Sequence, residues 1–484
     1  MSSWRGMTFE IRLGPPGHGG FCVGRHEGRV VFVRHGLPGE LVLARITEDR
    51  GGSFCRAEAI EILEASPDRI PATCPVSGPG GAGCCDFSYA TAAAQRALKA
   101  SVVAEQLRRI AGIEREIVVE PIAGYPAEET GGWRTRVRLV VDAQGRAGVH
   151  GYRSTEVVTD LRCPQPVPGA MDGIADRLWT PGADLVVAVD GDGVRHIVEL
   201  APPVVTHGRG GARRGRGRAD GPGGGRGAAP RRGDGRPGGR HPRDANGPRD
   251  HRDSAEGPRD DLDESGVDSG VDDRREAATR RAATHAVRDE WVIAGSGRTV
   301  EEVAGRRWEL SATGFWQAHR GAAQCYSDLV AEWAALGSGD IVWDLYSGVG
   351  VFAARLAEQV GPTGSVLAVE SARSAVADGH AALHDLPWLD LRADRVERWI
   401  ADHASGPAPE VVVLDPPRAG AGKEIVNALS EAGPARIIHI GCDPAAFARD
   451  LGLYQAAGYC LTDLRAFDAF PATHHVECLA LLEC

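Results

Sequence analysis

The chain has 484 residues, and at about 150 residues per domain this length allows about three domains. Its 66 acidic and 55 basic residues give a formal net charge of -11, which excludes a uniformly basic nucleic-acid-binding protein and leaves local patches as the source of any such affinity. The sequence has no charged and apolar leader, no apolar run long enough to span a bilayer, and an odd number of cysteines, 11. We therefore expect a cytoplasmic protein with reduced cysteines that act as metal ligands, nucleophiles or core residues.

Residues 1–67 have the pattern of a small all-β barrel. Short, partly alternating apolar runs such as MTFEIRLG and GRVVFVRHG are separated by Gly19-Gly20 and Pro38-Gly39, which interrupt strands. Residues 68–205 then combine a cysteine-rich segment, an alanine-rich helix over Tyr89–Ile113 and strands such as TRVRLVVD. This mixture predicts a β-rich central domain.

Composition changes abruptly over residues 206–287. Arginine and glycine dominate the first half and acidic residues the second. Apolar residues are too few to offset an ordering entropy of roughly 1–2 kcal/mol per residue, so we expect a disordered insertion. The strand-like HIVELAPPVVT before it continues as DEWVIAGSG after it, and residues 288–311 are therefore expected to return to the central domain. The Arg-Gly repeats are either a solvated linker or a weak, salt-sensitive RNA tether.

Residues 312–484 alternate helices, such as Ala318–Leu336, with the short buried runs DIVWDLY, SVLAVE, VVVLDPP and RIIHIGC. This alternation predicts βαβ units and an open, mostly parallel sheet. In such sheets ligands bind beyond the carboxyl ends of the strands. The residues that directly follow each run are therefore the candidate site residues.

The first two runs end in features of a nucleoside site. Gly348 and Gly350 in DLYSGVG allow a tight turn and a close approach of the backbone to a ligand, and Glu370 can accept hydrogen bonds from both hydroxyls of a ribose. No third glycine completes GxGxxG and no lysine follows, which disfavours a pyrophosphate clamp and excludes a P-loop. The pattern therefore favours a nucleoside cofactor without phosphates, S-adenosylmethionine.

Later runs supply the chemistry. Asp415 ends VVVL and is held at the sheet edge by the two prolines that follow it. Cys442 directly follows RIIHI and is the best candidate nucleophile, because a thiol is partly ionised at neutral pH and intrinsically reactive. Glu477 opens the last strand as a candidate general base. Arg418 stands where some amino-directed methyltransferases carry an aromatic residue that stacks on the base, which weakens an amino-methylation mechanism.

Five blocks in chain order resemble the RNA uracil-5-methyltransferase family of S-adenosylmethionine enzymes: FWQAHRGAA, DLYSGVGVF, VLDPPRAG, GCDPAAFARDL and FDAFPATHHVE. The N-terminal GHGGFCVGRHEGRVVFVRHGLPGE resembles the TRAM module, a small RNA-binding barrel. The resemblance implies an α/β fold: a C-terminal Rossmann-like methyltransferase domain over 312–484, an N-terminal TRAM (OB-like) β-barrel and a β-rich central domain. It implies formation of 5-methyluridine in RNA, with Cys442 attacking carbon 6 of the target uracil and Glu477 removing the carbon-5 proton.

The resemblance also assigns cofactor contacts. Four residues match the family's S-adenosylmethionine-binding positions: Gln317, Tyr346, Glu370 and Asp415. Asp394 is a weaker candidate for the adenine edge. The chain departs from the family at Ser347, where many members have cysteine, and at Val351, where they often have Asn or Thr. Val351 cannot form a side-chain hydrogen bond, so one cofactor contact is expected to be missing.

Family members with a TRAM module often bind a four-iron four-sulfur cluster through four cysteines. Here Cys74, Cys85 and Cys163 match that pattern, but Ala82 occupies the position of the CxxC partner of Cys85, and the adjacent Cys84 would have to replace it. Two alternatives stay open, a cluster bound by these four cysteines and a degenerate, metal-free site.

The substrate follows from weaker signals. The TRAM module and the cysteines favour 23S rRNA over tRNA by analogy with the family. The target uridine must leave its stack, and no obligate protein partner is expected. Arg134, Arg136 and Arg138 share one face of a predicted strand, which is either solvated or in contact with RNA phosphates. The competing functions are amino-group methylation of adenine or cytosine, and non-catalytic RNA binding.

Overall fold

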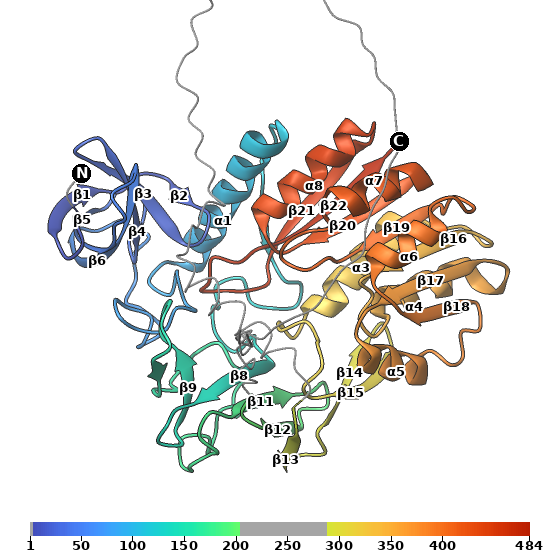
Figure 1. Ribbon diagram of the computed structural model, residues 1–484, viewed down its shortest axis with the longest axis horizontal. Helices are drawn as coiled ribbons and strands as arrows, with labels where there is room; N and C mark the ends of the chain where they lie inside the picture. Colours follow the sequence, from blue (N-terminus) through green and yellow to red (C-terminus); the bar gives the residue numbers. More distant parts are fainter. Residues whose placement is uncertain (1–2, 204–287) are drawn as a thin grey trace, which may run out of the picture. The chain divides into compact units, whose positions relative to one another are not determined.

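A computed structural model describes residues 3–203 and 288–484, and the predicted insertion at 206–287 lies outside these ranges. Within them, no helix is long and apolar enough to cross a membrane. The described residues form two six-stranded sheets, one eight-stranded sheet and one two-stranded hairpin (Figure 1).

The N-terminal sheet has the strand order β1-β5-β6-β4-β3-β2. Its strands are β1 (Thr8–Arg12), β2 (Pro16–Gly17), β3 (Phe21–His26), β4 (Arg29–Arg34), β5 (Leu41–Glu48) and β6 (Phe54–Glu64). Strands β1 and β3 also contact each other, so the sheet curls into a small barrel. Alternate residues of the strands, such as Val31 and Val33, fill its core, as the alternating sequence pattern predicts.

The central sheet has the order β10-β9-β8-β11-β12-β13. Its strands are β8 (Arg136–Val141), β9 (Ala147–His150), β10 (Val157–Val158), β11 (Asp184–Val189), β12 (Arg195–Leu200) and β13 (Glu290–Ala294). Strand β12 pairs with β13, with Val198 opposite Val292, so the chain on either side of residues 206–287 is continuous within one sheet. The hairpin of β14 (Arg298–Val303) and β15 (Arg306–Ser311) follows.

The C-terminal sheet has the order β18-β17-β16-β19-β20-β22-β21-β7. Its strands are β16 (Ile341–Leu345), β17 (Ser365–Glu370), β18 (Leu389–Ala393), β19 (Val411–Leu414), β20 (Arg436–Gly441), β21 (Cys460–Asp468), β22 (Glu477–Glu483) and β7 (Val119–Pro121). The first five in this order are parallel, as predicted, and β22 is antiparallel to β20. All four residues of β19 are buried, which explains the uninterrupted VVVL run.

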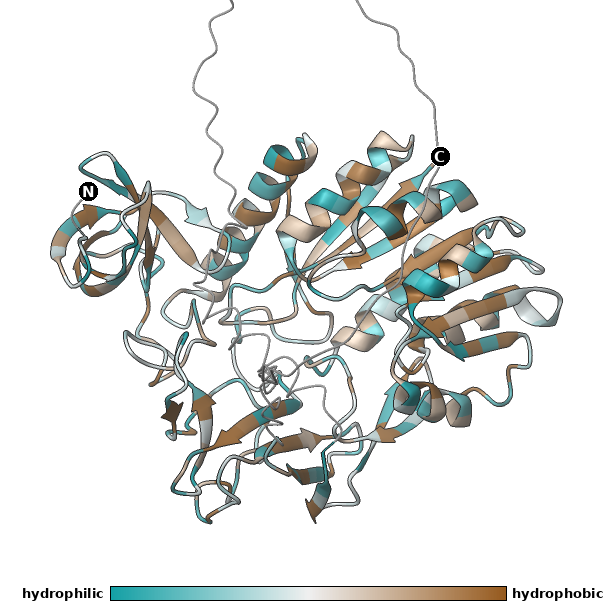
Figure 2. Ribbon diagram, in the orientation of Figure 1, coloured by the Kyte–Doolittle hydropathy of each residue, from teal (hydrophilic) through white to brown (hydrophobic). Residues whose placement is uncertain are grey.

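Helices cover both faces of this sheet, and each face has its own apolar core (Figure 2). One core includes residues of α3 (Ala322–Ala334), α4 (Val351–Val360) and α5 (Arg373–Ala382). The other includes residues of α1 (Ala92–Gln106), α6 (Val396–His403), α7 (Gly422–Ala432) and α8 (Pro444–Ala456). A π-helical turn, η1 (Leu107–Ala111), extends α1, and a 3-10 turn, η2 (Gly361–Thr363), follows α4.

From the sequence, the segment containing α1 and β7 is expected to belong to the central domain. In the structure this segment packs against the C-terminal sheet. Strand β7 pairs in parallel with β21, and the guanidinium of Arg465 donates to both carboxylate oxygens of Glu120. On α1, the fully buried Lys99 donates to Asp468 Oδ1 and to the carbonyl oxygen of Phe470 at 3.0 Å. These contacts join residues about 350 positions apart, so no local sequence pattern reports them.

The three arginines predicted to share a face have partners inside the protein. Arg136 pairs with Glu301 at 3.1 Å, and these side chains are only 10% and 8% exposed. Arg134 donates to the side chain of Gln165, and Arg138 pairs with Asp184 at 2.7 Å. Arg134 and Arg136 therefore face the protein, whereas the Arg138 side chain is 38% exposed beside Asp184.

Candidate active site

Strands of the C-terminal sheet deliver the candidate residues to one edge. Asp415 follows β19, Cys442 follows β20, and Glu370 ends β17. Strands β17 and β19 flank β16, and β20 lies beside β19; because all four are parallel, their carboxyl ends meet at the same edge. Strand β22 runs the other way, and its pairing with β20 ends with Cys478 opposite Gly441, so Glu477 and Cys442, the next residues along, come to this edge as well.

The environment of Cys442 opposes ionisation of its thiol. Burial, and then the charge of Glu477, raise the pKa of Cys442 to about 12, while the positive charge of Arg418 acts in the opposite direction. The thiol is therefore almost entirely protonated at neutral pH in the structure as it stands. A reaction that needs a thiolate here requires help from a cation or from a group that takes the proton.

The carboxyl groups at this edge also hold their protons unusually well. Burial raises the pKa of Asp415 to about 7 and that of Asp344, at the end of β16, to about 8. Burial and the charge of Asp415 raise the pKa of Glu477 well above its ordinary value. A carboxylate with a raised pKa is a stronger base than an exposed one, so Glu477 is suited to accept a proton.

The loop after β19 is clamped by helix α8. The buried carboxylate of Asp450 accepts hydrogen bonds from Ala421 N at 2.7 Å and from Gly422 N at 3.2 Å. Gly420 has φ +75°, and a Cβ there would come within 2.3 Å of Asp450 Oδ2, so this position requires glycine. At the start of the same loop, Arg418 Nη2 lies 3.2 Å from Nε2 of His475, which holds the guanidinium at the site.

The turn after β16 has the features of a nucleoside cradle. Gly350 has φ +84°, and a Cβ there would meet Leu383 Cδ1 at 2.7 Å. Glu370 Oε2 accepts from Gly348 N at 3.2 Å, so the predicted ribose acid lies against the glycine turn. Asp344 Oδ1 and Ser347 Oγ are buried with no hydrogen-bond partner among the described residues. Unpaired buried polar atoms beside a close-approach turn fit a polar ligand such as S-adenosylmethionine.

The other predicted cofactor residues are Gln317, Asp394 and Tyr346. Gln317 is half-buried on the segment before α3, where the neighbouring Ala318 oxygen accepts from Thr135 N at 2.9 Å. Asp394 accepts from Arg395 N at 2.6 Å and pairs with Arg398, so its carboxylate is engaged at the start of α6. Tyr346, in the glycine turn itself, has φ +62°, a conformation that non-glycine residues adopt at a cost.

The structure brings the four cysteines together, but of the two alternatives it does not support the iron-sulfur cluster. The thiol of Cys85 lies within hydrogen-bonding reach of the three others, Cys74, Cys84 and Cys163, and accepts from Gln165 Nε2 at 3.2 Å. Within residues 3–203 and 288–484, no group of three or more Cys, His, Asp or Glu side chains could hold a metal ion.

One buried side chain near the site has no signal in the sequence. Tyr326 on α3 is fully buried, and its hydroxyl has no partner among the described residues. Burial, and then the charges of nearby groups that include Glu477 and Asp415, raise its pKa, so the phenol lies within range of both carboxyl charges. Tyr326 looks like any core residue of an amphipathic helix, so sequence reasoning had no reason to select it.

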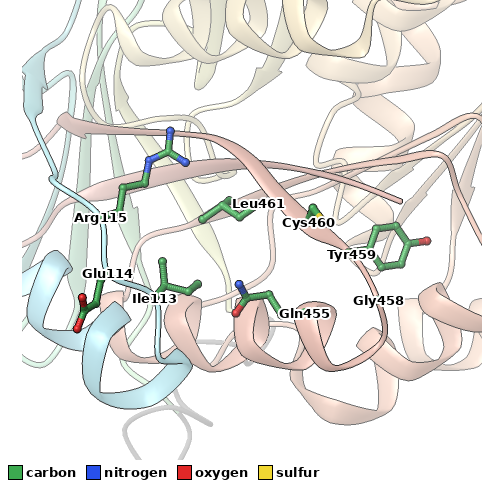
Figure 3. A pocket seen from close by; sticks show the side chains of 8 residues that line it. All are labelled: Ile113, Glu114, Arg115, Gln455, Gly458, Tyr459, Cys460 and Leu461. Carbon is green, nitrogen blue, oxygen red and sulfur yellow. The ribbon is translucent and has the colours of Figure 1, made fainter.

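A cavity of about 460 Å³ lies away from this site (Figure 3). It is bounded by the chain after η1, by the end of α8 and by Cys460 and Leu461 at the start of β21. Strand β21 runs in the same direction as β20, so its first residues lie at the opposite edge of the sheet from Cys442. None of the candidate site residues lines this cavity.

Comparisons with known proteins agree with the fold described above. A TRAM domain model matches residues 3–60, and a model described as tRNA (Uracil-5-)-methyltransferase matches residues 407–484. An uncharacterized RNA methyltransferase of Streptomyces avermitilis is 38% identical, with 99% of this chain and 98% of the relative covered. Another, of Corynebacterium glutamicum, is 33% identical, with 99% and 97% covered.

Among solved structures, the chain resembles a Pyrococcus abyssi tRNA (uracil-54, C5)-methyltransferase that was crystallised with S-adenosyl-L-homocysteine. The TM-score is 0.59, and the match covers 98% of this chain and 99% of the other at 18% identity. At this level of identity the similarity shows a shared fold.

Proposed function

Since the chain belongs to the TRAM-containing RNA uracil-5-methyltransferase family, and is thus an S-adenosylmethionine-dependent RNA methyltransferase, we propose that it forms 5-methyluridine by covalent catalysis. In this proposal Cys442 is the nucleophile and Glu477 the base. The observation that carries it is the register of β20 and β22, which pairs Gly441 with Cys478, the residues adjacent to Cys442 and Glu477, at the ligand-binding edge.

Carbon 5 of uracil is too poor a nucleophile to take a methyl group directly. Addition of the Cys442 thiolate to carbon 6 turns the ring into an enolate that is nucleophilic at carbon 5. Once carbon 5 carries the methyl group, Glu477 removes its proton and the thiol is eliminated, which restores the aromatic ring and frees the enzyme. The raised pKa of Glu477 suits a base that must take this proton.

Arg418 has a place in this scheme because the thiol is poorly ionised. It is the charge that favours the thiolate of Cys442 against burial and the neighbouring carboxyl groups. Its guanidinium is held by His475, two residues before Glu477. The same positive charge favours the enolate that forms after addition.

Four residues are proposed to hold the cofactor, Gln317, Tyr346, Glu370 and Asp415. S-adenosylmethionine supplies the methyl group when it is bound. The glycine turn and the unpaired polar atoms of Asp344 and Ser347 support this placement, because they offer a close backbone approach and free hydrogen-bonding capacity. Val351 adds no hydrogen bond from its side chain.

The proposed substrate is 23S rRNA, with the TRAM barrel contributing RNA affinity. The TRAM domain and the cysteine-rich segment support this choice by analogy with the family. A tRNA uridine is the second candidate, and the match of residues 407–484 to a model described as tRNA (Uracil-5-)-methyltransferase favours it.

Nucleoside mass spectrometry on unmodified 23S rRNA and tRNA, each incubated with S-adenosylmethionine and protein, tests the proposal. The wild type should form 5-methyluridine in one RNA, Cys442→Ala should form none, and Cys460→Ala should match the wild type because Cys460 is exposed at the other edge of the sheet. Methylated adenosine or cytidine, or a Cys442→Ala protein that still forms product, would overturn the mechanism.

A further inference from the structure

The eight residues before Glu477, AFPATHHV over 469–476, are held by the chain that follows the cysteines, and we call them the catalytic loop. Phe87 N donates to Ala472 O at 2.9 Å, and Ala472 N donates to Gln95 Oε1 at 2.7 Å. Ala472 has φ +67°, a conformation that costs energy for a residue with a Cβ. The loop therefore has its conformation imposed by elements outside the methyltransferase motifs.

Asp86 joins this loop to the N-terminal barrel. Its Oδ2 accepts hydrogen bonds from Nδ1 of His474 at 2.5 Å and from the backbone N of the same residue at 3.3 Å. Its Oδ1 accepts from Nη2 of Arg34, on barrel strand β4, at 2.8 Å. Both side chains of the Arg34–Asp86 pair are only 3% exposed. A single carboxylate thus bonds the barrel through one oxygen and the catalytic loop through the other.

Further contacts fix the same junction. A Cβ on Gly20 of the barrel would lie 2.9 Å from the side chain of Asp86, so the barrel backbone closely approaches this side chain. His18, on the same barrel turn, has Nε2 3.2 Å from Oδ2 of Asp443. Asp443 directly follows Cys442, and its other oxygen caps helix α8 by accepting from Ala445 N and Ala446 N. The barrel is therefore tied to both sides of the Cys442–Glu477 pair.

The carboxylate of Asp86 is buried and charged. Burial opposes ionisation of Asp86, but the hydrogen bond and charge of His474, together with Arg34, outweigh it and hold the pKa of Asp86 at about 2. A buried ion pair contributes little stability compared with apolar residues of the same shape. What it provides is a directional constraint, because each partner must stay in place to keep the other satisfied.

We propose that Asp86 is a positioning residue, which transmits the placement of the barrel through His474 to Glu477 and so sets the base relative to Cys442. The inference rests on the proposed function, because it takes Glu477 as the base. It gives the barrel a part in the chemical step in addition to RNA affinity.

Substitutions along the chain of contacts test this. Asp86→Asn, Arg34→Met and His474→Leu should each slow single-turnover formation of 5-methyluridine about 100-fold at saturating RNA and S-adenosylmethionine, the cost typical of a misplaced catalytic group. The dissociation constant for RNA should change less than about twofold, because these groups are buried or face the protein. His474→Asn should stay within about threefold of the wild type, because its amide N–H replaces Nδ1 as donor to Asp86.

The matched control is Arg12→Met, which removes a barrel arginine whose pair with Glu64 is more than half exposed, and it should behave as the wild type. A His474→Leu enzyme with an unchanged single-turnover rate would overturn the inference. So would variants that weaken RNA binding and leave that rate alone.

Hydrogen exchange separates this inference from the proposed function. In Asp86→Asn and His474→Leu, amides of the catalytic loop should exchange at least about tenfold faster, while amides of barrel strand β5 should exchange as in the wild type, and His474→Asn should change neither. Absence of 5-methyluridine from the wild type would refute the proposed function alone. Unchanged exchange in the loop would refute the positioning role alone.

Discussion

Replacing Glu477 by Gln should change the reactivity of Cys442 and the methylation rate in opposite directions. Gln keeps the shape of the side chain and removes its charge. Among the charged groups around Cys442, Glu477 contributes most to raising the thiol pKa to about 12. The variant thiol should therefore ionise more readily, even though the enzyme has lost its base.

The size of the effect follows from Coulomb's law. At about 5 Å, the spacing of neighbouring side chains in a sheet, two unit charges interact by about 3 kcal/mol at an effective dielectric of about 20. That is about two pKa units as an upper limit. Well below its pKa, a thiol is alkylated in proportion to its thiolate fraction, so alkylation of Cys442 should accelerate about 10- to 100-fold. Methylation should slow about 100- to 10,000-fold.

The assay is iodoacetamide labelling followed peptide by peptide, from about pH 6 to about pH 10, with the exposed Cys460 as internal standard. Because burial raises the pKa of Glu477, both proteins should react alike where this carboxyl group is protonated and diverge as it ionises. Slower or unchanged alkylation would show that Glu477 does not face the thiol. Undiminished methylation would show that it is not the base.

Three further outcomes are expected. Gly350→Ala should weaken S-adenosylmethionine binding at least about tenfold by calorimetry, since the left-handed backbone costs about 1–2 kcal/mol and the methyl group meets Leu383. Lys99→Met should lower the free energy of unfolding in urea by about 3–5 kcal/mol, because Asp468 stays buried without its cation. Asp344→Asn should match the wild type near pH 4 and be more stable near pH 8. A pKa raised to about 8 means that stability is lost as pH rises toward that value, by at most about 1.4 kcal/mol per pH unit.

Two controls accompany these variants. Gly348→Ala has a positive φ of 57° but open space around its Cβ, so it separates backbone strain from the clash at Gly350. Arg108→Ala breaks an exposed pair with Glu105 and should change stability by less than about 0.5 kcal/mol. An Asp344→Asn protein whose stability parallels that of the wild type at every pH would contradict the raised pKa of Asp344.

The parts of the fold that could be predicted from the sequence are those determined by local patterns within short segments. The VVVL run of β19 is buried on both faces, and the alternating β4 is buried on one, so period and composition alone identify them. Cys442 and Asp415 were found because each directly follows a buried parallel strand. Glu477 was found because it opens a buried strand, and the family resemblance gave it its role, but its approach to Cys442 depends on an antiparallel pairing that periodicity does not orient.

Other features depend on contacts between distant residues. From the sequence, Arg136 has the pattern of a surface cation. In the structure it pairs with Glu301, which lies far along the chain. The spacing of the four cysteines leaves two alternatives open, a metal cluster and a metal-free site. Spacing alone does not show how close the thiol of Cys85 lies to the other three. Asp86 and His474 lie 388 positions apart, and although His474 belongs to the block FDAFPATHHVE, nothing in that block points to Asp86. A single sequence contains no signal that would pair them.

The pairing of β7 with β21 has a consequence for how the chain folds during synthesis. Glu120 and Arg465 are 345 residues apart, so at roughly 5–20 residues per second the partner of β7 emerges about 17–70 s after it. The N-terminal barrel needs nothing from later residues for its own sheet and can close at once. The edge of β7 and the side of α1 that is buried in the folded protein remain exposed until the last strands have been synthesised. This interval, more than any property of the finished protein, is when the nascent chain is open to misassembly and to chaperones.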